Sequence, residues 1–285
     1  MNPWKLRLAR AFDRSGLSRG LLATQRVLLS PYLRAVNYHG IARADADAFD
    51  AQLEFYARHF EPIGIEQLEA FLGGRWRPGR PGLLLTFDDG LRSHAEVAAP
   101  LLERRGWPGW FCVPAGLPEA PCDDHRAFRE KHALSYDENE YEDRRGVLDW
   151  DDLRRLDRHH VIVCHTHSHR RLRADLSDAE RRHEIVEAKR LLEQHVEQPV
   201  RAFAWVGGEE ESYSAEAAAT LREAGFDFVL MTNTAPIRPW TDPHHLQRTN
   251  IEAHDPPEVV RFQLSGAMDL LYWPKRRRVD RMTAA

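Results

Sequence analysis

The chain has 285 residues, 42% of them hydrophobic and 29% charged, which is enough to bury a substantial core and fits one large α/β or barrel domain better than two ordinary domains. Its formal net charge of −4 is unevenly spread, because residues 1–40 carry seven Lys/Arg against one Asp and residues 275–285 carry five against one, which leaves −14 for the chain between them. An acidic body with short basic ends argues against a dedicated nucleic-acid-binding domain, which would show a basic face within the fold, so no nucleic-acid partner is predicted.

Cysteine usage and the N-terminal pattern predict a cytoplasmic location. Cys112, Cys122 and Cys164 form no CxxC pair, so neither a disulfide framework nor a four-cysteine zinc site is indicated, and a reducing compartment is the simpler interpretation. Charges interrupt the apolar pattern near the N-terminus, with no apolar core and small-residue cleavage site of a secretory signal. No stretch approaches the ~20 apolar residues of a membrane-spanning helix. We therefore expect a cytoplasmic protein, soluble or peripheral on the inner face of the membrane.

Short apolar, β-rich runs alternate with helical patterns along the chain. The predicted strands cover residues 35–38, 82–87, 110–113, 161–164, 201–206 and 226–231. Helical spacing covers 46–60 and 65–72. Ser177 with Glu180 forms a capping box for a helix that reaches His195, and Ser214 caps a helix over 215–224 that ends at Gly225. This repeat of strand and helix predicts an α/β fold and favours a (β/α) barrel, distorted or incomplete, over an open sheet.

Residues 118–146 interrupt this repeat. The segment is crowded with Asp, Glu, Arg and His and shows only weak periodicity. A long irregular insert in a compact domain is either a functional loop, such as a lid over a site, or a solvated charged surface. Both interpretations of this charged insert remain open.

Polar side chains follow two of the predicted buried strands. The first ends in Asp88 and Asp89, followed by glycine, which on its own is also an ordinary turn signal. The strand over 161–164 ends in three alternating histidines, His165, His167 and His169, which could also form an exposed polar loop. If both strands belong to one barrel, their ends lie on its C-terminal face. One aspartate and two histidines can then bind a divalent metal, with the second aspartate free to act as a base.

These two motifs resemble those of the polysaccharide deacetylases with the NodB homology domain, carbohydrate esterase family 4. TFDDG at 86–90 matches the first family motif and HTHSH at 165–169 the second, while the Asn-Tyr-His segment ending at His39 is similar to the family's early Tyr-His segment. The resemblance implies a seven-stranded, NodB-like barrel over residues 35–265, flanked by a basic N-terminal helical segment (1–34) and a basic C-terminal tail (266–285). It also implies that Asp89, His165 and His169 bind a metal ion, with zinc favoured over cobalt or nickel, and that Asp88 is the general base.

The later family motifs match less closely. FAWVGG at 203–208 is similar to the FAYPYG version of the third motif, but Val206 stands where proline is usual and Ala204 where other branches place a catalytic arginine. By this resemblance Trp205 is a candidate for lining the substrate site, with burial in the core as the alternative. The family's late Leu-His motif, which supplies a general acid, is not clear, because His244 and His245 precede the leucine.

Two further residues are candidates by resemblance. His39 is an alternative general acid at the end of the first strand, against a packing role. Arg248 lies in a segment similar to a late strand of the family, where it would orient a carboxylate or bind substrate. These residues complete the predicted site.

The resemblance implies a metal-dependent hydrolase of glycan biosynthesis that removes an N-acetyl group from a sugar in a glycan, a lipid-linked or a nucleotide-linked precursor. A metal-bound water would be the nucleophile and Asp88 its base. A catalytically weak, metal-containing carbohydrate-binding protein and an amidase for a non-sugar N-acyl substrate remain alternatives. The basic N-terminal segment and the basic run 275–278 would hold the protein on an anionic membrane, or are simply a packed surface helix and a solvated tail.

Overall fold

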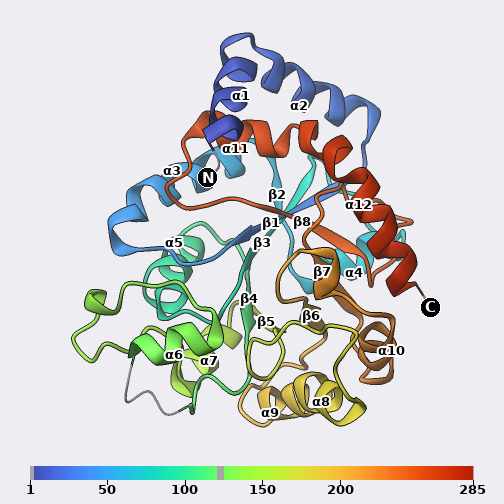
Figure 1. The fold of residues 1–285 in the computed structure, drawn as a ribbon. Helices are drawn as coiled ribbons and strands as arrows, with labels where there is room; N and C mark the ends of the chain where they lie inside the picture. The colour runs from blue at the N-terminus through green and yellow to red at the C-terminus, as the bar shows by residue number, and fades with distance from the viewer. Residues whose placement is uncertain (1–2, 121–124, 285) are drawn as a thin grey trace.

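A computed structural model describes residues 3–120 and 125–284, so Cys122 lies outside the described residues. Within them, seven parallel strands form a closed barrel, and Figure 1 shows the helices arranged around it. The strands are β1 (Leu33–Tyr38), β3 (Gly82–Phe87), β4 (Gly109–Val113), β5 (Val161–Cys164), β6 (Ala202–Ala204), β7 (Phe228–Met231) and β8 (Leu246–Asn250). The barrel closes because β1 also pairs with β3 along its whole length. The predicted seven-stranded (β/α) barrel is thus confirmed, with a two-residue strand β2 (Glu61–Pro62) added at the amino end of β3.

The strands are buried on both faces, as short and almost wholly apolar runs require. One set of side chains, including Leu84, Trp110 and Val163, fills the barrel interior. The alternate set, including Leu85 and Phe111, packs against the surrounding helices. Side chains at the carboxyl ends of the strands therefore lie over a rigid, filled barrel.

Several of the surrounding helices begin where local signals predict. Most belong to the βα units: α3 (Ala46–His59), α4 (Ile65–Leu72), α5 (Ala99–Glu103), α7 (Trp150–Asp157), α8 (Asp178–Arg182), α9 (Ala188–Glu193) and α10 (Ala215–Glu223). The capping box is confirmed, since Ser177 N–H donates to Glu180 Oε2 at 2.9 Å and Glu180 N–H donates to Ser177 Oγ at 3.3 Å. Ser214 likewise caps α10 through the N–H of Ala217 at 3.2 Å.

Four further helices gather at one side of the barrel, at the top and right of Figure 1. We call α1 (Pro3–Arg14), α2 (Leu17–Leu28), α11 (Pro257–Leu264) and α12 (Ala267–Thr283) the helical platform. Ala9, Val259, Phe262 and Met268 form its small core. The described part of the expected C-terminal tail is therefore mostly a packed helix. None of the helices in residues 3–120 and 125–284 has the length and apolar character needed to cross a bilayer.

The described part of the charged insert is also folded. It contains α6 (His125–His132) and a 3-10 turn, Glu138–Glu140. Its apolar side chains form a small cluster with the adjoining chain: Leu117, Phe128, Leu134 and Val147.

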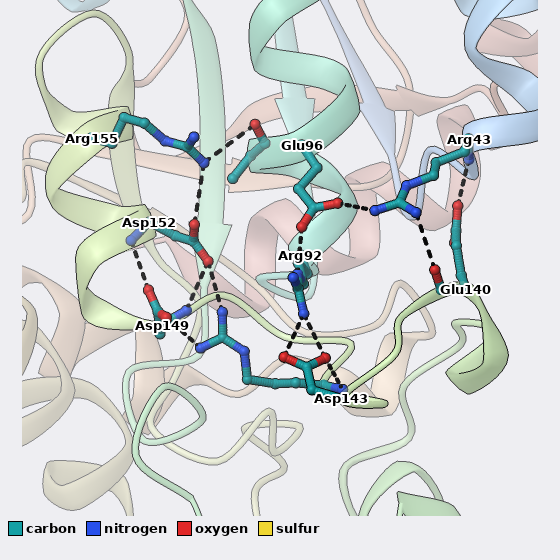
Figure 2. Close-up of polar contacts among 10 residues, drawn as sticks. Arg43, Arg92, Glu96, Glu140, Asp143, Asp149, Asp152 and Arg155 are labelled. Atoms are coloured by element: carbon teal, nitrogen blue, oxygen red, sulfur yellow. Dashed lines mark hydrogen bonds and ion pairs between the residues drawn. The ribbon is translucent and has the colours of Figure 1, made fainter.

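Ion pairs fasten this insert to the barrel (Figure 2). Arg92 donates to both carboxylate oxygens of Asp143, at 2.7 and 2.9 Å, and to Glu96 Oε1 at 2.6 Å. The backbone N–H of Arg43 donates to Glu140 Oε1 at 2.6 Å. The insert thus has defined contacts with the loops and helices that follow β1 and β3.

Candidate active site

Two carboxylates lie where β3 ends. The N–H of Asp88 continues the strand pairing to the Tyr38 carbonyl at 2.8 Å, and the backbone then turns through the left-handed region at Asp89 (φ 81°) and Gly90 (φ 61°). A non-glycine residue in this region is uncommon and costs energy, a feature that clusters at functional sites. Asp88 and Asp89 are each only 5% exposed, and both line the same groove.

Two imidazoles from the loop after β5 face Asp89. The Nδ1–H of His165 donates to the Ala204 carbonyl at 2.8 Å, and the Nδ1–H of His169 donates to the His132 carbonyl at 2.5 Å. Each ring is therefore held with its Nε2 towards Asp89 Oδ1, at 3.8 Å for His165 and 3.0 Å for His169. The structure thus brings together the three residues that the family resemblance implies as metal ligands.

This donor set fits a divalent metal ion. One ligand atom from each of Asp89, His165 and His169 lies within 4.8 Å of the others. Two imidazoles and a carboxylate form a ligand set typical of catalytic zinc and related metals, and carbonyl partners on the far ring nitrogens orient the imidazoles. Burial lowers the pKa of His165 to about 4, so its ring is neutral at pH 7, as ligation requires. Burial also opposes protonation of His169, but the adjacent Asp89 carboxylate outweighs it and raises the pKa of that ring.

A buried carboxylate that sequence reasoning missed holds the histidine loop. Glu184, 3% exposed, accepts the backbone N–H groups of His167 and Ser168, both at 2.9 Å, and the Ser168 hydroxyl at 2.6 Å. These bonds support a loop in which Thr166 and His169 take left-handed conformations, with φ 67° and 62°. Because Glu184 lies on the π-helical turn between α8 and α9, no local sequence signal ties it to the site.

Arg248 of β8 forms a buried ion pair with Asp88. Its guanidinium donates to Asp88 Oδ1 at 2.6 Å and to Oδ2 at 3.0 Å, and further to Thr86 Oγ1 at 3.1 Å and Asn37 Oδ1 at 3.0 Å. Burial alone would raise the pKa of Asp88, but the charge and hydrogen bonds of Arg248 hold it well below its usual range. Arg248 is 1% exposed and is not among the groove-lining residues, so the structure places it as an orienting residue and not against substrate.

His39 directly follows β1, the strand that pairs with β3, and lines the same groove as the two aspartates. Its Nδ1 lies 3.4 Å from Glu252 Oε1, and its side chain is 38% exposed. Burial lowers the pKa of His39, but the Glu252 partner and the charges of Asp89 and Asp88 outweigh it and raise the pKa to about 9. His39 is therefore protonated at neutral pH, the state that a general acid needs.

Trp205 is not at the groove. It is 1% exposed, and its ring packs on Phe203 and Tyr213 with centroids at 6.1 and 5.1 Å. The residue follows directly on β6 with its side chain in the layer between strands and helices, so the expectation that it lines the substrate site is corrected.

The histidines considered for the late motif are also distant from the candidate metal ligands. His244 and His245 precede β8 and therefore lie at the amino ends of the strands, opposite the groove. Their Nε2 atoms contact the Phe226 carbonyl and Thr283 Oγ1, both at 2.9 Å. These contacts tie the two histidines to neighbouring segments of the fold and not to the groove.

The groove above the aspartates has a volume of about 1410 Å³. The charged insert forms one wall with Lys131, His132 and Tyr136, and the loop after β6 and helix α12 add Gly207 and Lys275. No pattern in the sequence indicated that the insert would also orient His169, a candidate metal ligand, which it does through the His132 carbonyl. The groove exceeds the ~300–1,000 Å³ of typical small-molecule pockets and has room for an extended ligand.

Comparisons with known proteins agree with this geometry. The family model for polysaccharide deacetylase matches residues 77–229, just over half of the chain. Among solved structures, the chain is similar to Streptococcus pyogenes deacetylase PplD in complex with acetate, with 18% identity, a TM-score of 0.65, and coverage of 82% of this chain and 98% of that one. It is also similar to IcaB from Ammonifex degensii, with 20% identity, a TM-score of 0.62, and coverage of 84% and 97%.

A third similar structure is the de-N-acetylase from Aggregatibacter actinomycetemcomitans, with 13% identity, a TM-score of 0.65, and coverage of 81% of this chain and 99% of that one. At these identities the likeness concerns the fold. No curated protein matches the chain at a significant level.

Proposed function

Because the chain belongs to the polysaccharide deacetylase family, we propose that it is a metal-dependent hydrolase that removes the N-acetyl group from a sugar carried by a glycan, a lipid-linked or a nucleotide-linked precursor. The observation that carries this proposal is the convergence of Asp89, His165 and His169 beside a separately held carboxylate, Asp88. A ligand set and an independent base, side by side at the end of one groove, are what metal-assisted amide hydrolysis needs.

The three ligands would hold a divalent ion, with zinc favoured and cobalt or nickel as alternatives. Such an ion supplies a Lewis acid that polarises the amide carbonyl and makes a water molecule acidic enough to attack near neutral pH. The chain's own contribution is the orientation of the ligands. The carbonyls of Ala204 and His132 hold the imidazole Nε2 atoms towards Asp89.

Asp88 is the general base of this proposal. Arg248 keeps it ionised and fixes its plane through two hydrogen bonds, so it is ready to accept a proton from the attacking water at any pH above its lowered pKa. The same pair keeps Asp88 apart from the ligand set, because both of its oxygens already accept hydrogen bonds from the guanidinium. General-base assistance of this kind is typically worth ~10²- to 10⁴-fold in rate.

His39 is the general acid. It lies at the groove beside the aspartates and is held protonated by Glu252, so it can donate a proton to the departing sugar amine. Water adds to the carbonyl carbon, the carbon–nitrogen bond breaks, and the products are acetate and a free amino sugar. Asp88 and His39 thus have opposite protonation states at neutral pH, which is the arrangement that acid–base hydrolysis uses.

Acetate release from polymeric, lipid-linked and nucleotide-linked N-acetyl sugars, measured with added Zn²⁺ or Co²⁺, tests this proposal. We expect release from at least one of these classes and a loss of ~10²-fold or more in Asp88→Asn, which should still bind metal. Sugar binding without acetate release would favour the carbohydrate-binding alternative. Release only from non-sugar N-acyl compounds would favour the amidase. Normal turnover in Asp88→Asn would remove the assigned base.

A further inference from the structure

Helix α12 exposes a group of large apolar side chains. Leu270 is 82% exposed, Leu271 60% and Trp273 48%. They lie on the solvent side of the helix, whose other side buries Met268 and Val279. The guanidinium of Arg277 lies over the Trp273 ring, 5.0 Å from its centroid. The exposed side of α12 thus combines apolar and cationic groups.

This character extends over the helical platform. Among the described residues, nine large apolar side chains are strongly exposed, and eight of them are on α1, α2 and α12. Those on α1 and α2 are Trp4, Leu8, Leu17, Val27 and Leu28. The buried Arg34 of β1 links two of these helices, because it donates to Gln25 of α2 and to Asp269 of α12. The exposed apolar residues are therefore gathered on one packed unit and are not scattered as on an ordinary soluble surface.

The platform is basic although the chain as a whole is acidic. Helices α1 and α2 together contain six Lys/Arg and one acidic residue, Asp13, which is already paired with Arg261 at 2.6 Å. In the described residues, Arg7, Arg19 and Arg26 are exposed and form no ion pair. Exposed leucine and tryptophan beside unpaired arginine is the composition of helices that lie in the interface of an anionic bilayer.

The platform also forms part of the rim of the groove. Tyr272 packs against the platform core and lines the groove, and Lys275 lines it while donating to the Gly208 carbonyl. Leu271 lies next to Tyr272 in the chain and one turn before Lys275. A surface on which the exposed residues of α12 rest would therefore lie beside the opening of the groove.

We propose that the helical platform binds the surface of an anionic membrane and thereby holds the groove beside N-acetyl sugars that are attached to lipids in that membrane. The choice of substrate rests on the proposed deacetylase function, whereas the membrane contact does not. Charge is the reason for choosing lipid over a second copy of the chain, because two basic platforms would repel each other.

Vesicle co-sedimentation of the full chain tests the membrane contact. We expect binding to phosphatidylglycerol vesicles that weakens with added salt, and little binding to phosphatidylcholine vesicles. The variant Leu270→Ser/Leu271→Ser/Trp273→Ser should bind phosphatidylglycerol vesicles at least about tenfold more weakly. Trp240→Ser is the matched control: Trp240 is 75% exposed and stacked by Arg238, but lies in the loop before β8, near the amino ends of the strands.

Several outcomes would overturn this inference. They are no binding to phosphatidylglycerol by the intact chain, equal binding by the triple variant, or a triple variant that changes only the oligomeric state, which would make the platform a protein–protein interface. Circular dichroism of the variant checks that it is folded. A charge variant, Arg19→Gln/Arg26→Gln, provides an independent reading through a reduced dependence of binding on salt.

The membrane contact and the deacetylase function can fail separately. Asp88→Asn should bind vesicles like the unchanged chain, because the platform does not include the base. The triple variant should release acetate from a soluble N-acetyl oligosaccharide at the normal rate but lose at least about tenfold on a vesicle-bound glycolipid. Vesicle binding with no acetate release from any sugar supports the platform and contradicts the proposed function. Equal rates on the glycolipid with and without the triple substitution contradict the platform.

Discussion

Replacing Arg248 by glutamine removes the cation that holds Asp88, the proposed general base. The Arg248 and Asp88 side chains are 0% and 7% exposed and are joined by hydrogen bonds of 2.6 and 3.0 Å. Removing one partner of a buried ion pair costs about 3–5 kcal/mol of stability, because the other charge stays buried without compensation. We expect a loss near the lower limit, about 3 kcal/mol, since glutamine keeps an amide donor. Activity should fall by ~10²-fold or more, because Asp88 is no longer oriented.

The pH dependence of the Arg248→Gln variant follows from the sign of the pKa shift. In the unchanged chain the pKa of Asp88 is held below its ordinary value, so the stabilisation from the pair is present above about pH 3.9, the unfolded carboxylate pKa, and is lost as pH falls through the lower folded pKa. Without Arg248, burial raises the pKa of Asp88. The acid limb of kcat/KM should therefore move to higher pH.

Urea denaturation and acetate release, measured on the same samples, check both effects. Arg34→Gln is the matched control, because Arg34 is also 1% exposed and donates to both carboxylate oxygens of Asp269, at 3.1 and 2.7 Å, away from the groove. It should lose stability but keep its kcat on a soluble substrate. Normal activity and an unmoved acid limb in Arg248→Gln would refute the assigned role. Equal loss of activity in both variants would show that destabilisation, and not orientation of Asp88, is the cause.

Three further predictions concern the proposed metal ligand Asp89, the proposed general acid His39 and the turn at Gly90. Asp89→Ala should lose bound metal together with activity, and elemental analysis that finds normal metal content would contradict the ligand assignment. With the pKa of His39 at about 9, kcat/KM should decline as pH rises through that value, and the stabilisation from the His39–Glu252 pair should be lost over the same range. In Glu252→Gln, which removes the partner that raises this pKa, the decline in kcat/KM should begin at lower pH. An unchanged pH profile in Glu252→Gln would argue against His39 as the acid. Gly90→Ala should cost ~1–3 kcal/mol more than Gly106→Ala, because both have positive φ but only at Gly90 would a Cβ meet another side chain, at 3.2 Å; equal unfolding free energies would contradict this.

The residues proposed to bear the chemistry could be located from the sequence because they follow directly on their strands. Asp88 and Asp89 end one apolar run, His165 and His169 follow another, and parallel strands of a barrel bring their carboxyl ends to one face. Helix starts at Ser177 and other capping residues were equally accessible, since a cap depends on side chains only three residues apart.

Other features depend on which distant segments the barrel brings together. The carbonyl of His132 orients a ligand from a segment that has only weak periodicity, and Glu184 holds the histidine loop from a helix with no motif of its own. Strand β8 was not predicted from periodicity. Of its five residues only Leu246 is apolar, so the strand has no hydrophobic run, although its first four residues are buried and Arg248 donates to Asp88.

The sequence by itself determined that two aspartates and three histidines follow buried strands, and the rule that strand ends share a face placed them together in a barrel. The family resemblance then selected Asp89, His165 and His169 as candidate metal ligands and Asp88 as candidate base. Whether Trp205 met substrate or core, whether Arg248 touched substrate or Asp88, and whether the C-terminal basic run was a tail or a packed helix depended on the closure of β1 on β3 and on the faces that the flanking helices bury. A side chain's partner across the barrel is set by this long-range packing, and no local spacing of residues encodes it.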